Sequence, residues 1–446
     1  MRCSNFRRLT MATLRKFHLL TLGCKVNQYE SDLLRGQCMQ AGLSETTDAA
    51  GADILIVNTC GVTATAVGKS RRAVRALLRK NGRALVVATG CAVDLDRADF
   101  AMDGVRLVPQ AEKSNVLAGI IADAPARTLP ECGRTRALLK IQDGCDQFCA
   151  YCVVPHVRSR MWSKPFTEAL DEARHLVARG HKEIVLTGVR LGLYDGGGGR
   201  SLRRLLEAVD GLDGLARVRF SSLEIKEIDD GLLDAMARSR TFCRHLHLPL
   251  QSGDDEVLSR MNRPYGAAEY LRRVGEIRAA LGRVAITTDV IVGFPGETKA
   301  QFENTLRVCR EAAFSKIHIF PFSARKPAPA AEMPDKVPAA EMRARAKTLA
   351  ELEKELAATY KKSLAGDIVE VLVEGRAGKM LEGKTRDYVT VEFEGSESLM
   401  REIVHVRVNE IDGLRARGSS VECAKDAKCE SRNKSSRLSK SPTLSC

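Results

Sequence analysis

No stretch of this sequence approaches the roughly 20 consecutive apolar residues that a membrane-spanning helix needs, which argues against a membrane protein. The N-terminus also lacks the apolar core and the cleavage site of a secretory signal peptide. With 44% hydrophobic and 28% charged residues, the composition is that of a soluble globular protein, and we expect it in the cytoplasm. Acidic residues are outnumbered, and the net charge of +14 favours an anionic partner such as nucleic acid.

Metal ligation explains the 14 cysteines better than disulfide bonds do. Disulfide frameworks are typical of short secreted chains, whereas this chain has 446 residues and an enzyme-like composition. Single hydrophobic cores rarely grow beyond a few hundred residues, so the length predicts two or three domains.

Residues 1–16 are predicted to form a basic N-terminal extension, because they contain no acidic residue. Their basic residues are Arg2, Arg7, Arg8, Arg15 and Lys16. The segment is either a basic arm or targeting leader, or a frayed extension with Met11 as the alternative start.

Residues 17–125 are predicted to form a parallel α/β domain. Strand-like runs that end in loops at 18–27, 52–62 and 84–93 alternate with helical runs at 30–43 and 66–80. Strands and helices in alternation favour a parallel sheet with helices on its faces.

Three cysteines each directly follow a predicted strand of this domain: Cys24, Cys60 and Cys91, here called the sheet triad. The strand ends at one edge of an open α/β sheet form a ligand crevice, so we expect the three thiols to converge there. The alternative is three structural thiols that are buried on their own account.

A predicted linker at 126–134 leads to a second alternating region at 135–357. Its six strand-like runs lie near 138–144, 183–189, 217–223, 245–251, 286–294 and 316–322, with helices between them. Six strands in βα order predict a parallel partial barrel.

The region at 358–417 is predicted to be a small β-barrel, because from Asp367 it consists of short strands with turns. Barrels of this OB-like class often bind nucleic acid. Residues 418–446 are rich in Ser and Lys and are predicted to form a disordered basic tail.

The barrel triad, Cys145, Cys149 and Cys152, forms a C-x3-C-x2-C motif just after a predicted strand. Three thiolates cannot close a structural zinc site, which takes four ligands, without another donor. A cubane iron–sulfur cluster normally takes four cysteines, so a triad leaves one iron open to an exogenous ligand. A zinc loop or a coincidental group of cysteines is the alternative.

The segment QDGCDQFCAYCVVP closely resembles the signature of the radical S-adenosylmethionine (SAM) superfamily. The resemblance implies that the barrel triad holds a catalytic [4Fe-4S] cluster that binds SAM and cleaves it to a 5′-deoxyadenosyl radical. It also implies an electron donor such as flavodoxin or ferredoxin. The family pattern places Ser222, Gln251 and Asp289 at the SAM site, although loop caps or turns would explain each of them as well.

The flanks of the sheet triad narrow the choice within this superfamily. TLGCKVNQYESD, VNTCGVTATA and ATGCAV closely resemble the methylthiotransferase family, and the likeness covers about residues 19–413. It implies a second, auxiliary [4Fe-4S] cluster on the sheet triad, a sulfur donor, and transfer of a methylthio group to a substrate carbon. Such chemistry depends on cofactors rather than on side-chain bases.

The family implies three targets: isopentenyladenosine at tRNA position 37, threonylcarbamoyladenosine at the same position, and an aspartate of a ribosomal protein. GCKVNQYES and FPFSARKPAPAAEMP resemble the threonylcarbamoyladenosine branch, which implies methylthiolation of carbon 2 of that base beside the anticodon. Ser159 and the pair Lys326 and Pro327 depart from the branch pattern. The other two targets remain alternatives, as does an RNA-binding protein with structural or redox-sensing clusters.

A predicted basic helix presents Arg71, Arg75 and Arg79 on one face, which suits tRNA phosphates. A solvated basic face without a partner is the alternative. The C-terminal unit resembles a TRAM domain, which implies RNA binding, and Lys384 and Arg386 are among its basic residues. The expected fold class is therefore α/β: an N-terminal parallel α/β domain, a radical SAM partial (β/α)6 barrel and a small TRAM-like β-barrel.

Overall fold

The structure, a computed structural model, describes residues 16–117, 128–199, 201–413 and 415–421. Most of the expected basic extension and of the expected tail, and part of the expected linker, lie outside these residues. The chain divides into two compact units, residues 1–356 and 357–446. Within the described ranges, none of the helices combines the length and the apolar character that crossing a membrane requires.

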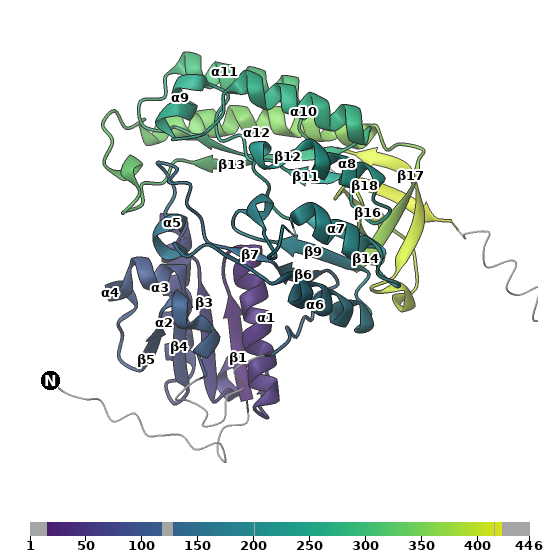
Figure 1. Ribbon diagram of the computed structural model, residues 1–446. Helices are drawn as coiled ribbons and strands as arrows, with labels where there is room; N and C mark the ends of the chain where they lie inside the picture. Colours follow the sequence, from purple (N-terminus) through teal and green to yellow (C-terminus); the bar gives the residue numbers. More distant parts are fainter. Residues whose placement is uncertain (1–15, 118–127, 200, 414, 422–446) are drawn as a thin grey trace, which may run out of the picture. The chain divides into compact units, whose positions relative to one another are not determined.

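The first unit begins with a five-stranded parallel sheet in the order β2-β1-β3-β4-β5 (Figure 1). The strands are β1 (Lys16–Thr21), β2 (Ser44–Glu45), β3 (Ile54–Thr59), β4 (Leu85–Gly90) and β5 (Val105–Val108). The helices and 3-10 turns are α1 (Lys25–Gln40), η1 (Ala49–Gly51), α2 (Ala64–Lys80), α3 (Cys91–Leu95), α4 (Arg97–Phe100) and η2 (Gln110–Asn115).

Strand β3 is buried along its whole length because the sheet is covered on both faces. Ile54 and Ile56 pack in one core with Leu34 of α1, whereas Leu55 packs in another core with residues of α2. The predicted parallel α/β arrangement is confirmed.

Helix α1 begins at Lys25, five residues before the predicted helical run at 30–43. Val26, Tyr29 and Leu33 follow one another at helical spacing, and this face is buried or half-buried against the core, so the helix extends back to Cys24 at its N-cap.

Six parallel strands form the predicted partial barrel, β6-β9-β10 followed by β11-β12-β13. They are β6 (Ala137–Lys140), β9 (Glu183–Thr187), β10 (Arg217–Phe220), β11 (His245–His247), β12 (Ala285–Val292) and β13 (Lys316–Pro321). A parallel bridge between Ser222 and His247 joins the two sets, and a short hairpin, β7 (Gln142–Asp143) with β8 (Trp162–Ser163), flanks the barrel triad.

Helices cover the outside of this barrel, and their apolar residues form the largest core of the protein (Figure 1). They are α6 (Phe166–Ala178), α7 (Leu202–Asp210), α8 (Asp230–Arg238), α9 (Asp255–Arg260), α10 (Ala267–Leu281), α11 (Lys299–Ala312) and α12 (Ala339–Lys362), with turns η3 (Leu191–Leu193), η4 (Ile225–Glu227) and η5 (Pro329–Ala331). The short helix α5 (Val154–Val157) follows the barrel triad and lies beside α3 of the N-terminal sheet. A capping box of Thr298 and Gln301 begins α11.

The second unit contains a closed five-stranded barrel in the order β14-β15-β16-β18-β17, which confirms the predicted small β-barrel. Its elements are β14 (Ile368–Ala377), β15 (Met380–Thr385), β16 (Thr390–Phe393), η6 (Glu397–Leu399), β17 (Ile403–Asp412) and β18 (Arg415–Ser420). Strand β18 extends beyond the expected start of the tail at residue 418, because it pairs with both β16 and β17 and thereby closes the barrel.

Candidate active site

The barrel triad lies in the loop between β7 and α5, where backbone amides point at its sulfurs. The amides of Gln147 and Val154 lie 3.4 Å from the Sγ atoms of Cys145 and Cys152, respectively. Burial raises the pKa of Cys152 to about 12, and the amide of Val154 acts in the opposite direction. Donors of this kind stabilise thiolates, which are the form that ligates iron.

Gly144 allows this loop to pass close to the returning chain. Its φ is +84°, and a Cβ built there would lie 2.2 Å from the carbonyl oxygen of Arg160. Only glycine fits such an approach, so the tight path of the loop into Cys145 depends on it.

Arg263 lies beside the barrel triad, a placement that the sequence analysis did not predict. Its Nη1 is 3.3 Å from Sγ of Cys149, and its guanidinium also forms an ion pair with Glu224 and donates to the hydroxyl of Tyr265. Arg263 therefore places a buried positive charge beside the cysteine ligands.

The structure brings the sheet triad together at the carboxyl edge of the N-terminal sheet. Cys24 caps α1, Cys60 follows β3, and Cys91 follows β4 as the first residue of α3. The three thiols are close enough to affect one another. Burial raises the pKa of Cys60 and of Cys91; Cys24 and Cys91 raise the pKa of Cys60 further, and Cys24 does the same to Cys91. Gly90 is required at the turn into Cys91, because a Cβ there would lie 2.5 Å from a carbonyl oxygen at a φ of +102°.

Neither triad gathers its sulfurs closely enough to hold a single metal ion. Two thiolates on one zinc ion are at most about 4.6 Å apart, because each Zn–S bond is about 2.3 Å long. In the part of the chain that the structure describes, only His247, Asp289 and His318 place three His, Cys, Asp or Glu donor atoms within 4.8 Å of one another. A cubane does not require its cysteine sulfurs to lie this close, because its ligands sit on different irons.

The predicted SAM-site residues lie close together on neighbouring strands of the barrel and the loops that follow them. Nε2 of His247 is 3.3 Å from Oδ1 of Asp289, and the backbone amide of Gln251 donates to the carbonyl of Asp289 at 2.8 Å. Ser222 forms the bridge with His247, and His318 places its ring centroid 5.5 Å from that of His247. The sequence analysis singled out Ser222, Gln251 and Asp289 but neither histidine, although both histidines lie on predicted strands.

The end of the barrel that follows strand β13, here called the barrel mouth, lies against the loop that follows Cys60 of the sheet triad. The backbone amide of Ala64 donates to Oγ of Ser323 at 3.2 Å, and Arg325 donates to the carbonyl of Gly61 at 3.3 Å. These bonds join the loop after β3 to the segment after β13.

Burial lowers the pKa of His318 and the charge of Lys25, next to Cys24, lowers it further, so this imidazole is neutral at pH 7.

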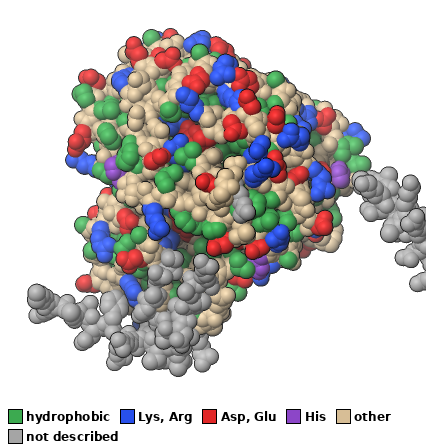
Figure 2. Space-filling view, viewed as in Figure 1, with side chains coloured by type: hydrophobic (Ala, Val, Ile, Leu, Met, Phe, Trp, Pro, Cys, Tyr) green, Lys and Arg blue, Asp and Glu red, His purple; other side chains and the backbone are tan. Residues whose placement is uncertain are grey.

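The predicted RNA-binding residues lie on two separate units. On α2, Arg75 and Arg79 are exposed, whereas Arg71 forms an ion pair with Asp99 at 2.8 Å. In the C-terminal barrel, Lys384 donates to Thr390 and lies over the ring of Tyr388, and Arg386 pairs with Glu370 at 2.6 Å. Basic and acidic side chains are interspersed on the face shown in Figure 2, so net charge alone does not mark an RNA-binding surface there.

Comparison with known proteins decides the family. Residues 139–309 match the radical SAM superfamily, and residues 16–108 match an uncharacterized protein family, UPF0004. The threonylcarbamoyladenosine tRNA methylthiotransferase MtaB of Chlamydia pneumoniae is 40% identical over 386 residues, which cover 84% of this chain and 91% of that protein. MtaB of Thermotoga maritima is 36% identical over 420 residues, with 90% and 94% covered. This chain belongs to the methylthiotransferase family of radical SAM enzymes.

This methylthiotransferase also shares its fold with a solved radical SAM protein. The methyltransferase TsrM of Kitasatospora setae matches it with a TM-score of 0.53 at 14% identity, covering 83% of this chain and 81% of that chain. Membership of the radical SAM superfamily implies SAM and a [4Fe-4S] cluster as cofactors, and the barrel triad lies within the matched residues.

Proposed function

We propose that this protein is a tRNA methylthiotransferase that modifies carbon 2 of N6-threonylcarbamoyladenosine at position 37, beside the anticodon. The observation that carries the proposal is the placement of two cysteine triads at facing edges, one in the barrel and one at the N-terminal sheet. The names of the relatives in Chlamydia pneumoniae and Thermotoga maritima support the choice of base.

The two triads have separate roles in this proposal. The barrel triad would hold the cluster that binds SAM, and when bound this pair supplies a 5′-deoxyadenosyl radical for C–H activation. The sheet triad would hold the auxiliary cluster, which supplies the sulfur. The protein contributes the backbone amides that point at the sulfurs of Cys145 and Cys152, and the guanidinium of Arg263 beside Cys149.

The barrel mouth would position the adenine and its side group. Asp289 lies 3.3 Å from Nε2 of His247, and His318 lies beside them, so the three side chains offer hydrogen-bond donors and acceptors to a substrate. Side-chain acids and bases are not expected to perform the central step, because an aromatic C–H is too weakly acidic.

Two surfaces of basic residues would hold the tRNA by its phosphates. Arg71, Arg75 and Arg79 lie on α2, and Lys384 and Arg386 lie on the C-terminal barrel. We place the reaction in the cytoplasm, with an electron donor such as flavodoxin or ferredoxin and a separate sulfur donor as partners.

The alternative with a specific observation behind it is dimethylallyladenosine at the same tRNA position. The tRNA-2-methylthio-N(6)-dimethylallyladenosine synthase of Carboxydothermus hydrogenoformans is 33% identical over 430 residues, covering 89% of this chain and 97% of that protein. Its lower identity than that of MtaB favours threonylcarbamoyladenosine as the substrate.

Mass spectrometry of tRNA nucleosides from cells that lack this protein tests the proposal. We expect loss of the methylthio form of threonylcarbamoyladenosine alone, restored by the natural chain and by Cys38→Ala, a buried cysteine of α1 outside both triads. Cys60→Ala and Cys149→Ala should not restore it. Loss of the methylthio form of dimethylallyladenosine instead would assign the protein to the alternative substrate.

A further inference from the structure

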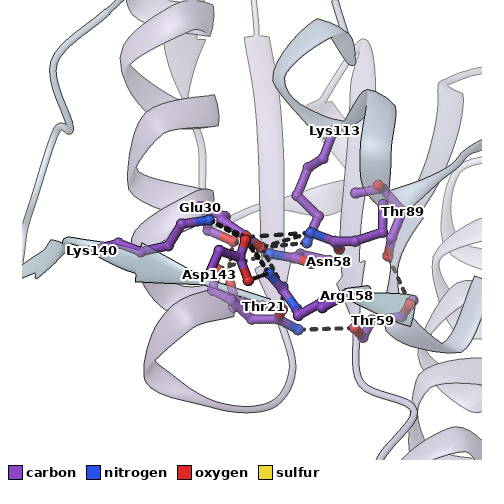
Figure 3. Close-up of polar contacts among 12 residues, drawn as sticks. Thr21, Glu30, Asn58, Thr59, Thr89, Lys113, Lys140, Asp143 and Arg158 are labelled. Carbon is purple, nitrogen blue, oxygen red and sulfur yellow. Dashed lines mark hydrogen bonds and ion pairs between the residues drawn. The ribbon is translucent and has the colours of Figure 1, made fainter. Parts of the chain in front are cut away.

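Arg158 lies among polar and charged side chains of the N-terminal sheet and the barrel (Figure 3), and it connects the segments that carry the two triads. Its backbone carbonyl accepts a hydrogen bond from the amide of Cys145 at 3.0 Å, which fixes the start of the barrel triad. Its buried side chain extends to the N-terminal sheet, where Nη2 donates to Oδ1 of Asn27 at 3.1 Å. A single residue therefore holds one cysteine loop by its backbone and reaches the other by its side chain.

Asn27 carries this contact on to the sheet triad. Its side-chain amide donates to the carbonyls of Leu22 and Thr59, both at 2.9 Å, so it joins the segments that precede Cys24 and Cys60. Through Asn27, the guanidinium of Arg158 is tied to the backbone at two of the three cysteines.

The guanidinium of Arg158 is buried close to the sheet triad. Its side chain is 4% exposed, and its partner Asn27 lies in the first turn of α1, just after Cys24. A Cβ built on Gly23 would lie 3.1 Å from both Nδ2 of Asn27 and Sγ of Cys60, so Asn27 is also a neighbour of that sulfur. The sheet triad thus has a buried cation beside it.

Two carboxylates limit this positive charge. Glu30 accepts from Lys113 at 2.6 Å, from Lys140 at 2.9 Å and from Arg158 at 2.8 Å. Asp143 accepts from Lys140 at 2.7 Å and from Arg158 at 2.8 Å. Three cations and two carboxylates leave one net positive charge between the sheet and the barrel (Figure 3).

Stability alone does not explain so many charges in this place. Removing charged groups from water is costly, and well-packed apolar residues are often as stabilising as a buried ion network. The reduction potential of an iron–sulfur cluster, in contrast, depends on hydrogen bonds to its sulfurs and on the nearby charge. A cation favours the reduced cluster, which carries one more negative charge.

We propose that Arg158 is a positioning residue that raises the reduction potential of the cluster on the sheet triad and ties that cluster to the barrel triad, while Glu30 moderates its charge. The inference rests on the proposed function, because it takes the sheet triad to hold a cluster.

The test is an anaerobic redox titration, followed by electron paramagnetic resonance, of the full chain with only the sheet-triad cluster present. Cys145→Ala, Cys149→Ala and Cys152→Ala together remove the other cluster. At a fixed potential, Arg158→Gln should lower the ratio of reduced to oxidised cluster about tenfold, a shift of about 59 mV for a one-electron couple. Glu30→Gln should shift the potential in the positive direction.

Two further variants serve as controls. Arg158→Lys keeps the charge but loses the planar fork, so its potential should lie between those of Arg158→Gln and the parent chain. Arg204→Gln removes an exposed arginine of α7, which pairs with Glu207, and should leave the potential unchanged. If Arg158→Gln fails to retain its cluster, the other two variants still test the proposal: the reduction potential should rise in Glu30→Gln and fall in Arg158→Lys.

The iron and sulfide content of the unsubstituted chain distinguishes a failure of the proposed function from a failure of the role proposed for Arg158. About four irons per chain instead of about eight would refute the auxiliary cluster, and with it the proposed function. Eight irons with potentials unmoved by both Arg158→Gln and Glu30→Gln would overturn the present inference alone. A loss of hydrogen-exchange protection at residues 24–31 with an unmoved potential would make Arg158 a structural brace only.

Discussion

Replacing Glu172 by Gln leaves a buried lysine without its counter-ion and should strongly destabilise the first unit. Lys164 forms an ion pair with Glu172 of α6, and both side chains are less than one-tenth exposed. Lys164 also donates to the hydroxyl of Tyr29 at 2.8 Å, and that hydroxyl donates to Glu172 at 3.1 Å. The three residues therefore join α1 of the N-terminal sheet to the barrel.

The loss of stability in Glu172→Gln depends on how Lys164 responds, because the lysine can either keep its charge or lose its proton. Breaking a buried pair while the remaining charge stays costs about 3–5 kcal/mol. Loss of the proton instead costs about 4.6 kcal/mol at pH 7, since the unfolded pKa is near 10.4 and each unit is worth about 1.36 kcal/mol. At pH 9 the same loss costs only about 1.9 kcal/mol. We therefore expect a deficit of about 3–5 kcal/mol at pH 7 that shrinks as the pH rises.

Thermal unfolding of the cluster-free chain at pH 7 and pH 9 measures this deficit. At about 2–4 °C per kcal/mol, the melting temperature of Glu172→Gln should fall by roughly 6 °C or more at pH 7, and by less at pH 9. Asp171→Asn is the matched control, because Asp171 lies on the same helix in an exposed pair with Arg174 that contributes at most about 1 kcal/mol. A deficit equal to that of the control, or one independent of pH, would refute the reasoning.

Three further predictions concern the sheet triad, the barrel and the RNA contacts. Gly90→Ala should reduce the iron content from about eight to about four per chain, whereas Gly68→Ala, a helix glycine with open space around it, should retain all the iron and gain up to about 1 kcal/mol. Burial, together with nearby cations, holds the pKa of His245 well below its usual value. The free energy of unfolding should therefore fall as the pH drops below about 6.5, where only the unfolded chain binds the proton. Denaturant titrations at several pH values should show a weaker pH dependence for His245→Gln. Arg75→Glu and Arg79→Glu should each weaken tRNA binding and reduce the salt dependence by about one unit of slope, and unchanged slopes would exclude these phosphate contacts.

Local patterns predicted the parts of the site that depend on one segment or on the order of segments. The barrel triad is a single motif, and its loop follows directly from the spacing. The convergence of Cys24, Cys60 and Cys91 followed from topology, because the ends of parallel strands share an edge. Ser222 and Asp289, in contrast, were assigned to the SAM site by the family pattern, and that role stays a prediction.

Long-range charge pairs leave no such pattern. Glu30 and Arg158 are 128 positions apart, and neither lies in a periodic run that marks it as buried. Strands β15 and β18 also have no clear strand pattern, because MLEGKT and RARGSS contain few β-branched or aromatic residues. They form because closure of the barrel satisfies their backbone hydrogen bonds, which is a tertiary effect.

The net charge of +14 overstates the positive charge that the surface offers to RNA. Lys113, Lys140, Arg158 and Lys164 all contribute to the total of +14, yet each is buried or nearly so and paired with a carboxylate inside the first unit. A buried cation beside a carboxylate attracts an external phosphate only weakly, because most of its field is cancelled close by. We therefore expect the attraction for tRNA to come from exposed arginines such as Arg75 and Arg79 of α2, and a variant that removes these should lose RNA affinity while the internal ion network and both triads stay intact.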